Sequence, residues 1–295
     1  MKKLGLATAV LLAMTGAQAY QFEVQGQSEY IDSTVNDKNF TGSVQGTYYL
    51  KNVDSAKGPL AEAAFLNQAS NVSLAYTYAP VDLDDALNIE SHTYGVKGEA
   101  YIPTKFVPAY ASASYNHTKL NLDANNDTFK DNGDRYAVEL GAVIVPNFLV
   151  AVGYTSVVDT IALDAFGIMN NGIAKAVGEA ATIADDQDAI TARVKYVGAI
   201  DGTNMAIGFE SGLVYGESTA YQLKTDLYLN PQLSVGASYA ESSYDDVLPN
   251  KAWGVNVNYF ITPAVAVGAS YVNANAEKGS VLDTQTVGVN AKFRF

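Results

Sequence analysis

Apolar and polar residues alternate with a period of two along nearly the whole chain. Between Phe40 and Leu50, apolar and small residues occupy one set of alternate positions and Thr, Ser, Gln and Tyr occupy the other. Successive side chains of a β-strand point to opposite faces, so this alternation predicts strands with one apolar and one polar face. We predict about fourteen strands, within residues 20–25, 40–50, 72–78, 94–101, 109–117, 135–142, 148–154, 190–196, 205–213, 221–229, 233–239, 253–259, 265–271 and 287–295.

The connections between these strands alternate in length and composition. The short ones, mostly with proline, are residues 102–108, 145–147, 199–203, 230–231 and 262–263. The longer ones, rich in Asp, Asn and Ser, are residues 32–39, 81–90, 119–134, 158–187, 242–250 and 273–283. Bacterial outer-membrane barrels have short periplasmic turns and longer extracellular loops, whereas a soluble β-sandwich has no reason to keep this parity. The sequence therefore predicts an all-β fold, a transmembrane antiparallel up-and-down β-barrel of about fourteen strands.

Residues 1–19 have the features of a secretory signal peptide. Two lysines precede an apolar stretch, which is followed by an A-x-A cleavage sequence at residues 17–19. The order of these features favours a signal peptide over a buried N-terminal strand or helix. We therefore predict that the mature protein begins at Tyr20 and that residues 20–295 form a single barrel domain in the bacterial outer membrane.

Composition narrows the classes of function. The chain has no cysteine, which argues against thiol catalysis, a disulfide scaffold and a zinc–thiolate site. The net charge of −13 becomes −15 without the two lysines of the signal peptide, and nucleic-acid binding would instead require a basic face. No run of about 18 consecutive apolar residues follows the signal peptide, so no transmembrane helix is predicted.

Two segments depart from the strand pattern. Pro59–Leu66 is predicted to form a short helix on the periplasmic side, with proline in its first turn. The connection 158–187 is the longest and is unusually apolar, and residues 173–184 within it are predicted to form a helix. A loop of this length in a compact domain is usually functional or disordered. We expect it to fold into or over the lumen, with a surface cap on the rim as the alternative.

Charged residues recur on the polar faces of the predicted strands. A basic side chain near the midplane of the hydrocarbon costs roughly 2–4 kcal/mol, so these faces are expected to point into the lumen. Two interpretations carry nearly equal weight: a zone that selects ions, or a salt-bridged network that fills a narrow lumen. The candidate pore-lining residues are Lys97, Glu99, Arg135, Glu139, Arg193, Lys195, Glu210, Lys224 and Asp226.

The carboxyl end of the chain has a distinctive pattern. Phe295 is the last residue, and apolar residues precede it at alternate positions back to Val287. This arrangement resembles the C-terminal signal that the barrel-assembly machinery reads, with Val289, Phe293 and Phe295 as its residues. The alternative is a last strand that ends in Phe by chance, which the signal peptide and the barrel pattern make the weaker interpretation.

No set of residues has the pattern of an enzyme active site. The only histidines, His92 and His117, lie near the ends of predicted strands. Ser114 is at an odd offset from His117, so the two side chains point to opposite faces of a strand. We interpret both histidines as interface residues and predict no enzymatic activity.

One outer connection has a spacing similar to that of a calcium-binding loop. Asp123, Asn125, Asp127 and Asp134 lie at suitable intervals, but Thr128 occupies the sixth position, where the sharp turn requires glycine. We interpret the segment as a solvated outer loop that makes at most weak contact with divalent ions. No metal site and no cofactor are predicted.

Four stretches of the chain are specific, namely residues 20–27, 58–67, 201–209 and 291–295. They resemble an outer-membrane porin family of Acinetobacter-type bacteria, whose best-known member is associated with loss in carbapenem-resistant strains. The resemblance covers the whole chain and implies a fourteen-strand channel for water and small hydrophilic solutes, which its loops can narrow or block. The loops 81–90, 119–134 and 242–250 look least like the family, so a substrate preference set there does not transfer.

Other classes of function compete with a channel. A barrel with a blocked lumen could act as an adhesion or host-contact protein through its loops. A transporter of hydrophobic substrates would need a plug before its first strand, whereas the first strand is expected to begin at Tyr20. We expect a monomer whose partners are outer-membrane lipid, the barrel-assembly machinery and small polar solutes, and not nucleic acid.

Overall fold

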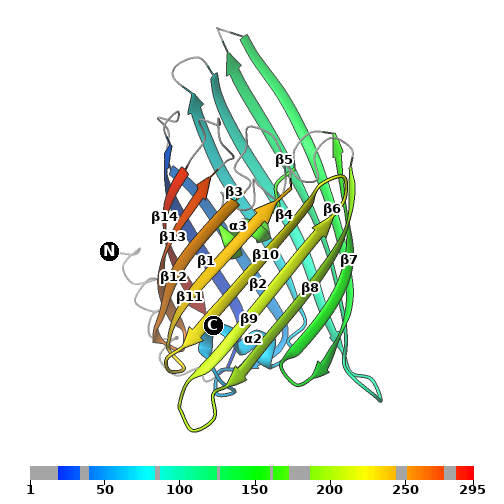
Figure 1. The fold of residues 1–295 in the computed structure, drawn as a ribbon, viewed down its shortest axis with the longest axis vertical. Helices are drawn as coiled ribbons and strands as arrows, with labels where there is room; N and C mark the ends of the chain where they lie inside the picture. Colours follow the sequence, from blue (N-terminus) through cyan, green and yellow to red (C-terminus); the bar gives the residue numbers. More distant parts are fainter. Residues whose placement is uncertain are drawn as a thin grey trace, which may run out of the picture.

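Fourteen antiparallel strands form one closed barrel in the computed structural model (Figure 1). They follow the sequence order around the barrel and β1 pairs with β14, which confirms the predicted fold class and strand number. The structure describes residues 19–33, 40–83, 87–124, 127–159, 162–172, 187–243, 251–275 and 284–295. The strands are β1 (Ala19–Ser33), β2 (Phe40–Asp54), β3 (Asn71–Leu83), β4 (Leu87–Ile102), β5 (Ala109–Ala124), β6 (Asp127–Val145), β7 (Phe148–Asp159), β8 (Asp188–Ala199), β9 (Ala206–Tyr215), β10 (Thr219–Tyr228), β11 (Leu233–Ser242), β12 (Lys251–Thr262), β13 (Val265–Asn275) and β14 (Thr284–Arg294).

The outer surface of the barrel is apolar. Leu74, Leu140 and Val152 point outward from β3, β6 and β7, and they are 64%, 67% and 60% exposed. An exposed apolar surface that encircles a barrel marks contact with lipid. Ser73 and Glu139, the neighbours of two of these residues, face the lumen, so the alternation in the sequence separates a lipid face from a lumen face.

The two ends of the barrel differ in their connections. Short turns, such as the one between Val145 and Phe148, lie at the end where β1 begins and β14 ends. Bacterial outer-membrane barrels keep their short turns on the periplasmic side. This end is the lower one in Figure 1, where the label C marks the carboxyl terminus.

The sheet continues beyond the predicted strand ends in β3 to β6. β3 and β4 remain paired as far as Leu83 and Leu87, and β5 and β6 remain paired along their whole hairpin. The loops predicted at 81–90 and 119–134 are therefore wrong in large part. Ladder hydrogen bonds join the backbone groups of these strands, and the register places Ile89, Leu122 and Phe129 in one apolar row across β4, β5 and β6. Figure 1 shows these strands rising above the rest of the rim; we call them the ridge, residues 81–83, 87–91, 119–124 and 127–134.

The start of β1 departs from the predicted alternation. A register shift between Tyr20 and Phe22 in the β1–β2 pairing reverses the direction of the side chains that precede it. Tyr20 is only 3% exposed and its ring meets the ring of Tyr49 edge-on at 5.5 Å. The period-two pattern of residues 20–25 predicts that Tyr20 shares the apolar outward face with Phe22, and this prediction is wrong because of the β-bulge.

Two segments that are not strands lie inside the barrel. η1 (Leu60–Glu62) and α2 (Ala63–Leu66) confirm the short helix predicted for this region. α3 (Ala165–Asn171), which belongs to the connection 158–187, lies against β2, β3 and β4. The helix predicted over residues 173–184 lies outside the described residues. None of the described helices is long and apolar enough to cross a membrane.

The main apolar core lies inside the barrel near its periplasmic end. Phe65 of α2 packs in one cluster with Tyr110, Leu149, Val197 and Tyr228, which come from β5, β7, β8 and β10. Full burial of a large apolar side chain stabilises a fold by about 1.5–3 kcal/mol. The short helix is therefore anchored within the lumen and not in the periplasm.

Candidate pore and its lining

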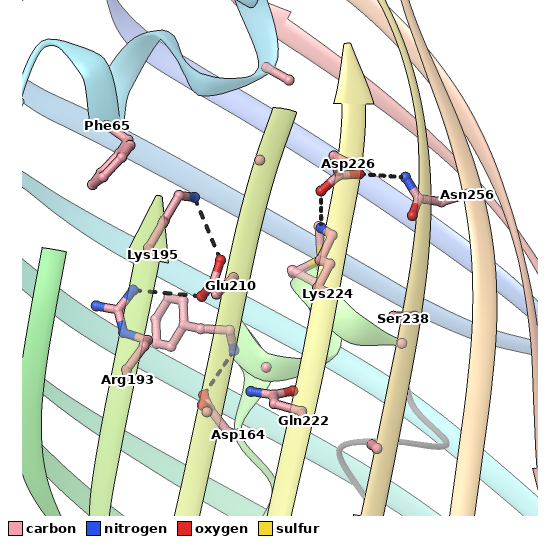
Figure 2. Close-up of a pocket in the computed structure, with 18 of the residues that line it drawn as sticks. Phe65, Asp164, Arg193, Lys195, Glu210, Gln222, Lys224, Asp226, Ser238 and Asn256 are labelled. Carbon is pink, nitrogen blue, oxygen red and sulfur yellow. Dashed lines mark hydrogen bonds and ion pairs between the residues drawn. The ribbon is translucent and has the colours of Figure 1, made fainter. Parts of the chain in front are cut away.

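A cavity of about 550 Å³ lies inside the barrel, and inward-facing side chains from every strand line it. All the predicted pore-lining residues are on its wall, and Arg135, at 4% exposed, is the most buried of them. Figure 2 shows part of this wall. The predicted residues come from β4 (Lys97, Glu99), β6 (Arg135, Glu139), β8 (Arg193, Lys195), β9 (Glu210) and β10 (Lys224, Asp226).

η1 and α2 form a floor at the periplasmic end of the cavity. Glu62 pairs with Lys195 at 2.9 Å and accepts a hydrogen bond from the hydroxyl of Tyr228 at 2.8 Å. Arg294 donates to the carbonyl of Leu60 at 2.9 Å. Burial disfavours ionisation of Glu62, but the Lys195 ammonium outweighs it and keeps the pKa of Glu62 below its ordinary value. Charged contacts from three strands thus hold the floor in place.

α3 narrows the cavity from one side. Asp164 caps this helix by accepting a hydrogen bond from the backbone N–H of Phe166 at 3.0 Å. Asn116 of β5 accepts from the backbone N–H of Ala165 at 3.2 Å and donates to Asp164 at 3.4 Å. The described part of the connection 158–187 therefore lies inside the lumen, as expected. α3 thus covers the wall formed by β2 to β5, and many of the side chains that line the cavity come from β9 to β13.

A tight network of charges joins β4, β5, β6 and β8. Arg193 pairs with Glu139 at 3.0 Å and donates to the hydroxyl of Tyr110 at 2.8 Å. Tyr110 in turn donates to Glu99 at 2.8 Å, and Lys97 pairs with Glu99 at 3.1 Å. Of the two sequence interpretations, this part of the lining matches the salt-bridged network.

The wall formed by β9 to β12 holds its charges more loosely (Figure 2). Glu210 lies 3.6 Å from the Lys195 ammonium, and Lys224 lies 3.6 Å from Asp226. Asn256 donates to Asp226 at 3.3 Å. Both ion pairs are longer than an ordinary charge-assisted hydrogen bond, which measures about 2.7–2.9 Å. Glu210 and Lys224, whose side chains are each 33% exposed, therefore remain available to solutes in the cavity.

Several groups in these contacts were not singled out as candidates from the sequence. Tyr110, Tyr228 and Asn256 lie on the polar faces of predicted strands, so strand parity alone could have found them. Glu62 and Asp164 lie in or beside short helices, where no period-two signal exists. Their contact with the pore lining depends on how distant parts of the chain pack, which a local pattern does not report.

Gly236 of β11 lies between Asp226 and Asn256 on the wall formed by β9 to β12. A Cβ atom at this position would overlap the Asp226 carboxylate. Gly236→Ala is therefore expected to push Asp226 into the cavity and to lower single-channel conductance about twofold, because close-packed walls transmit such overlaps. Gly46→Ala is the matched control, since nothing lies within 4 Å of a Cβ at that position. An unchanged conductance of a folded Gly236→Ala barrel would place the conducting path elsewhere.

Both histidines lie on the outward face of the barrel and do not line the cavity. His92 is 2.8 Å from the hydroxyl of Tyr76, and His117 is 2.7 Å from the carboxylate of Asp134. Tyr94, on the same face of β4 as His92, is 47% exposed. These contacts place the histidines in an outer aromatic zone of the lipid face.

The segment with calcium-like spacing is part of the ridge, where its acidic residues lie at different heights of the β5–β6 hairpin. Asp123 and Asp127 lie near the tip of the β5–β6 hairpin, whereas Asp134 is opposite His117 further down the ladder. Asn125 lies outside the described residues. The interpretation of this segment as a solvated loop is wrong, because most of it is paired strand. Among the described residues, no group of three or more His, Asp or Glu side chains could hold a metal ion.

Comparison with known proteins identifies the family of a barrel with these features. The family described as "Putative general bacterial porin" matches residues 1–295. The chain belongs to this porin family. It is thus a porin-type outer-membrane β-barrel, which confirms the predicted localisation. No curated protein sequence matches the chain.

Among solved structures, one has high sequence identity to this porin and others share only its fold. It is 54% identical to the Acinetobacter baumannii outer membrane protein Omp33. The match covers 95% of this chain and 100% of that one, with a TM-score of 0.70. This match confirms the resemblance to porins of Acinetobacter-type bacteria. The TodX monoaromatic hydrocarbon channel deltaS2 mutant is 10% identical, covering 95% and 91%, with a TM-score of 0.55. A Pseudomonas aeruginosa FadL homologue is 9% identical, covering 94% and 90%, with a TM-score of 0.51, so these two share the fold alone.

Proposed function

We propose that this porin is a passive diffusion channel for water and small hydrophilic solutes. The observation that carries the proposal is the polar cavity, which receives side chains from every strand inside a barrel with an apolar outer surface. The floor and α3 reduce the free cross-section, which favours small solutes. The family supports a channel, and no catalytic role is proposed for any residue.

The closed ladder supports a single chain as the functional unit. β1 pairs with β14, so no described strand is left with an open edge that a second copy would cover. We propose a monomer in outer-membrane lipid, with residues 1–19 removed as a signal peptide. We also propose that Val289, Phe293 and Phe295 are read by the barrel-assembly machinery, since these side chains are 58%, 37% and 45% exposed on the outer face.

Single-channel recording in planar bilayers, with a salt gradient across the membrane, tests the channel. Steady openings are expected from the purified barrel, and the sign of the reversal potential would report its charge preference. Folding is checked by the shift in electrophoretic mobility between unheated and boiled samples. A silent bilayer with a folded barrel would contradict the channel.

The second candidate is a blocked barrel that makes surface contacts through its outer parts. The observation that favours it is the presence of α2 and α3 inside the lumen. Deletion of residues 160–186 separates the two candidates. A channel is expected to change its conductance, whereas an adhesion protein is expected to change only its binding to cells.

A further inference from the structure

Glu210 of β9 and Lys224 of β10 are opposite charges that face each other without forming an ion pair. The register places them directly across from each other, where oppositely charged side chains usually interact. Among the contacts of the described residues, Glu210 turns instead toward Lys195 at 3.6 Å and Arg193 at 3.7 Å, and Lys224 turns toward Asp226 at 3.6 Å. Figure 2 shows the two side chains directed to different neighbours.

Both groups are open to the cavity. The side chains of Glu210 and Lys224 are each 33% exposed, whereas those of Glu139 in the tight network and Glu62 in the floor are 18% and 14% exposed. All of these residues line the same cavity. The facing side chains of Glu210 and Lys224 therefore border the open part of the cavity and not the packed part of the lumen.

The neighbouring charges compensate one another. The Lys195 ammonium is held by Glu62 at 2.9 Å, and Arg193 is held by Glu139 at 3.0 Å. A lone cation attracted to Glu210 is repelled by the nearby Lys195. A lone anion attracted to Lys224 is repelled by Asp226 in the same way. A solute that carries both charges can place its ammonium at Glu210 and its carboxylate at Lys224, so each of its charges meets a group of opposite sign and offsets part of this repulsion.

We propose that Glu210 and Lys224 form a subsite for small zwitterions of the free amino-acid type. The ammonium group of the solute binds the Glu210 carboxylate, and its carboxylate binds the Lys224 ammonium. Charge-assisted hydrogen bonds are roughly twice as strong as neutral ones, so a zwitterion gains more here than a neutral solute of equal size. The inference rests on the proposed channel function, because the solute must enter the cavity.

The test compares the swelling rates of proteoliposomes in isosmotic free glycine and in glycolamide, a neutral solute of similar size. Wild-type protein is expected to admit glycine about threefold faster than glycolamide, as the additional charge-assisted contacts imply. Glu210→Gln and Lys224→Gln are each expected to lower the glycine rate to the glycolamide rate. Neither variant is expected to change the glycolamide rate by more than about 1.5-fold, since neutral hydrogen bonding is retained.

Reversal potentials give a second readout that general disturbance of the lumen would not produce. Lys224→Gln removes a positive charge and is expected to shift the potential toward cation preference, and Glu210→Gln toward anion preference. Lys105→Gln and Glu217→Gln are the matched controls. They make the same charge changes at exposed turns outside the cavity lining and are expected to leave both measurements unchanged.

The possible outcomes separate the subsite from the channel itself. Equal rates of glycine and glycolamide through wild-type protein would overturn the subsite and leave the channel standing. Shifts of the same sign in both variants would also overturn it. If neither solute entered through a folded barrel, the channel would fail and the subsite with it. A glycine preference that disappears in both variants, with potentials shifted in opposite directions, would establish the subsite.

Discussion

Replacing residues 57–68 with a short glycine–serine linker is expected to raise single-channel conductance on the order of tenfold, because the floor then no longer obstructs the periplasmic end of a barrel this wide. The replacement removes Glu62 and Phe65, which connect the floor to Lys195 and to the apolar core. The strands themselves keep their ladder partners, since β2 pairs with β1 and β3 outside the replaced segment. Planar-bilayer recording measures the change.

The matched control for this replacement is a linker of the same kind in place of residues 201–204. That turn lies at the same end of the barrel but is largely exposed and does not line the cavity. Its replacement is expected to leave conductance unchanged. A floor replacement that folded yet conducted like the wild type would mean that the narrowest point lies at α3.

Arg294→Met is expected to produce the largest loss of stability. The Arg294 side chain is only 2% exposed, pairs with Glu23 at 2.7 Å and lies over the rings of Tyr20 and Phe260 at 4.5 and 4.6 Å. Removal of one partner of a buried ion pair leaves the other charge poorly compensated and costs about 3 kcal/mol or more. Lys292, at 3.2 Å from Glu23, compensates only part of this loss. Urea unfolding of the folded barrel in lipid vesicles measures the effect.

The double variant Glu23→Gln/Arg294→Met distinguishes charge burial from simple loss of packing. It removes the isolated carboxylate and is expected to recover part of the lost free energy of unfolding. If Arg294→Met alone unfolded at the same urea concentration as the wild type, Arg294 would not stabilise the junction of β1 and β14. Its contact with the floor at Leu60 would then have little influence on barrel closure.

Strand parity predicted the barrel and its lining because the two faces of a membrane strand meet opposite environments. A residue such as Lys224 is excluded from lipid, so its position in the alternation determines the side on which it lies. The same reasoning identified Arg193 and Glu139 from separate strands, and the structure joins them. Parity does not report rotamers, so the sequence did not indicate that Glu210 turns away from Lys224.

Three features of the structure were not predicted from the sequence. The position of Glu62 within the lumen depends on packing of α2 among distant strands. The inward position of Tyr20 depends on a bulge, which shifts the register without any change in composition. The ridge was predicted as loops because residues 119–134 are rich in Asp and Asn, although Leu120 and Leu122 continue the alternation and backbone pairing there is complete as far as Asp127.

The ridge determines what an antibody or phage meets on this side of the barrel. Residues that lie side by side on the ridge come from different strands. Asn88 of β4, Asp123 of β5 and Thr128 of β6, for example, form one row across the sheet. A binder that reads this surface recognises a discontinuous epitope. A free peptide of residues 119–134 has only a part of each row and is marginally stable as a hairpin. Antisera raised against that peptide would therefore recognise the denatured chain better than the intact cell surface.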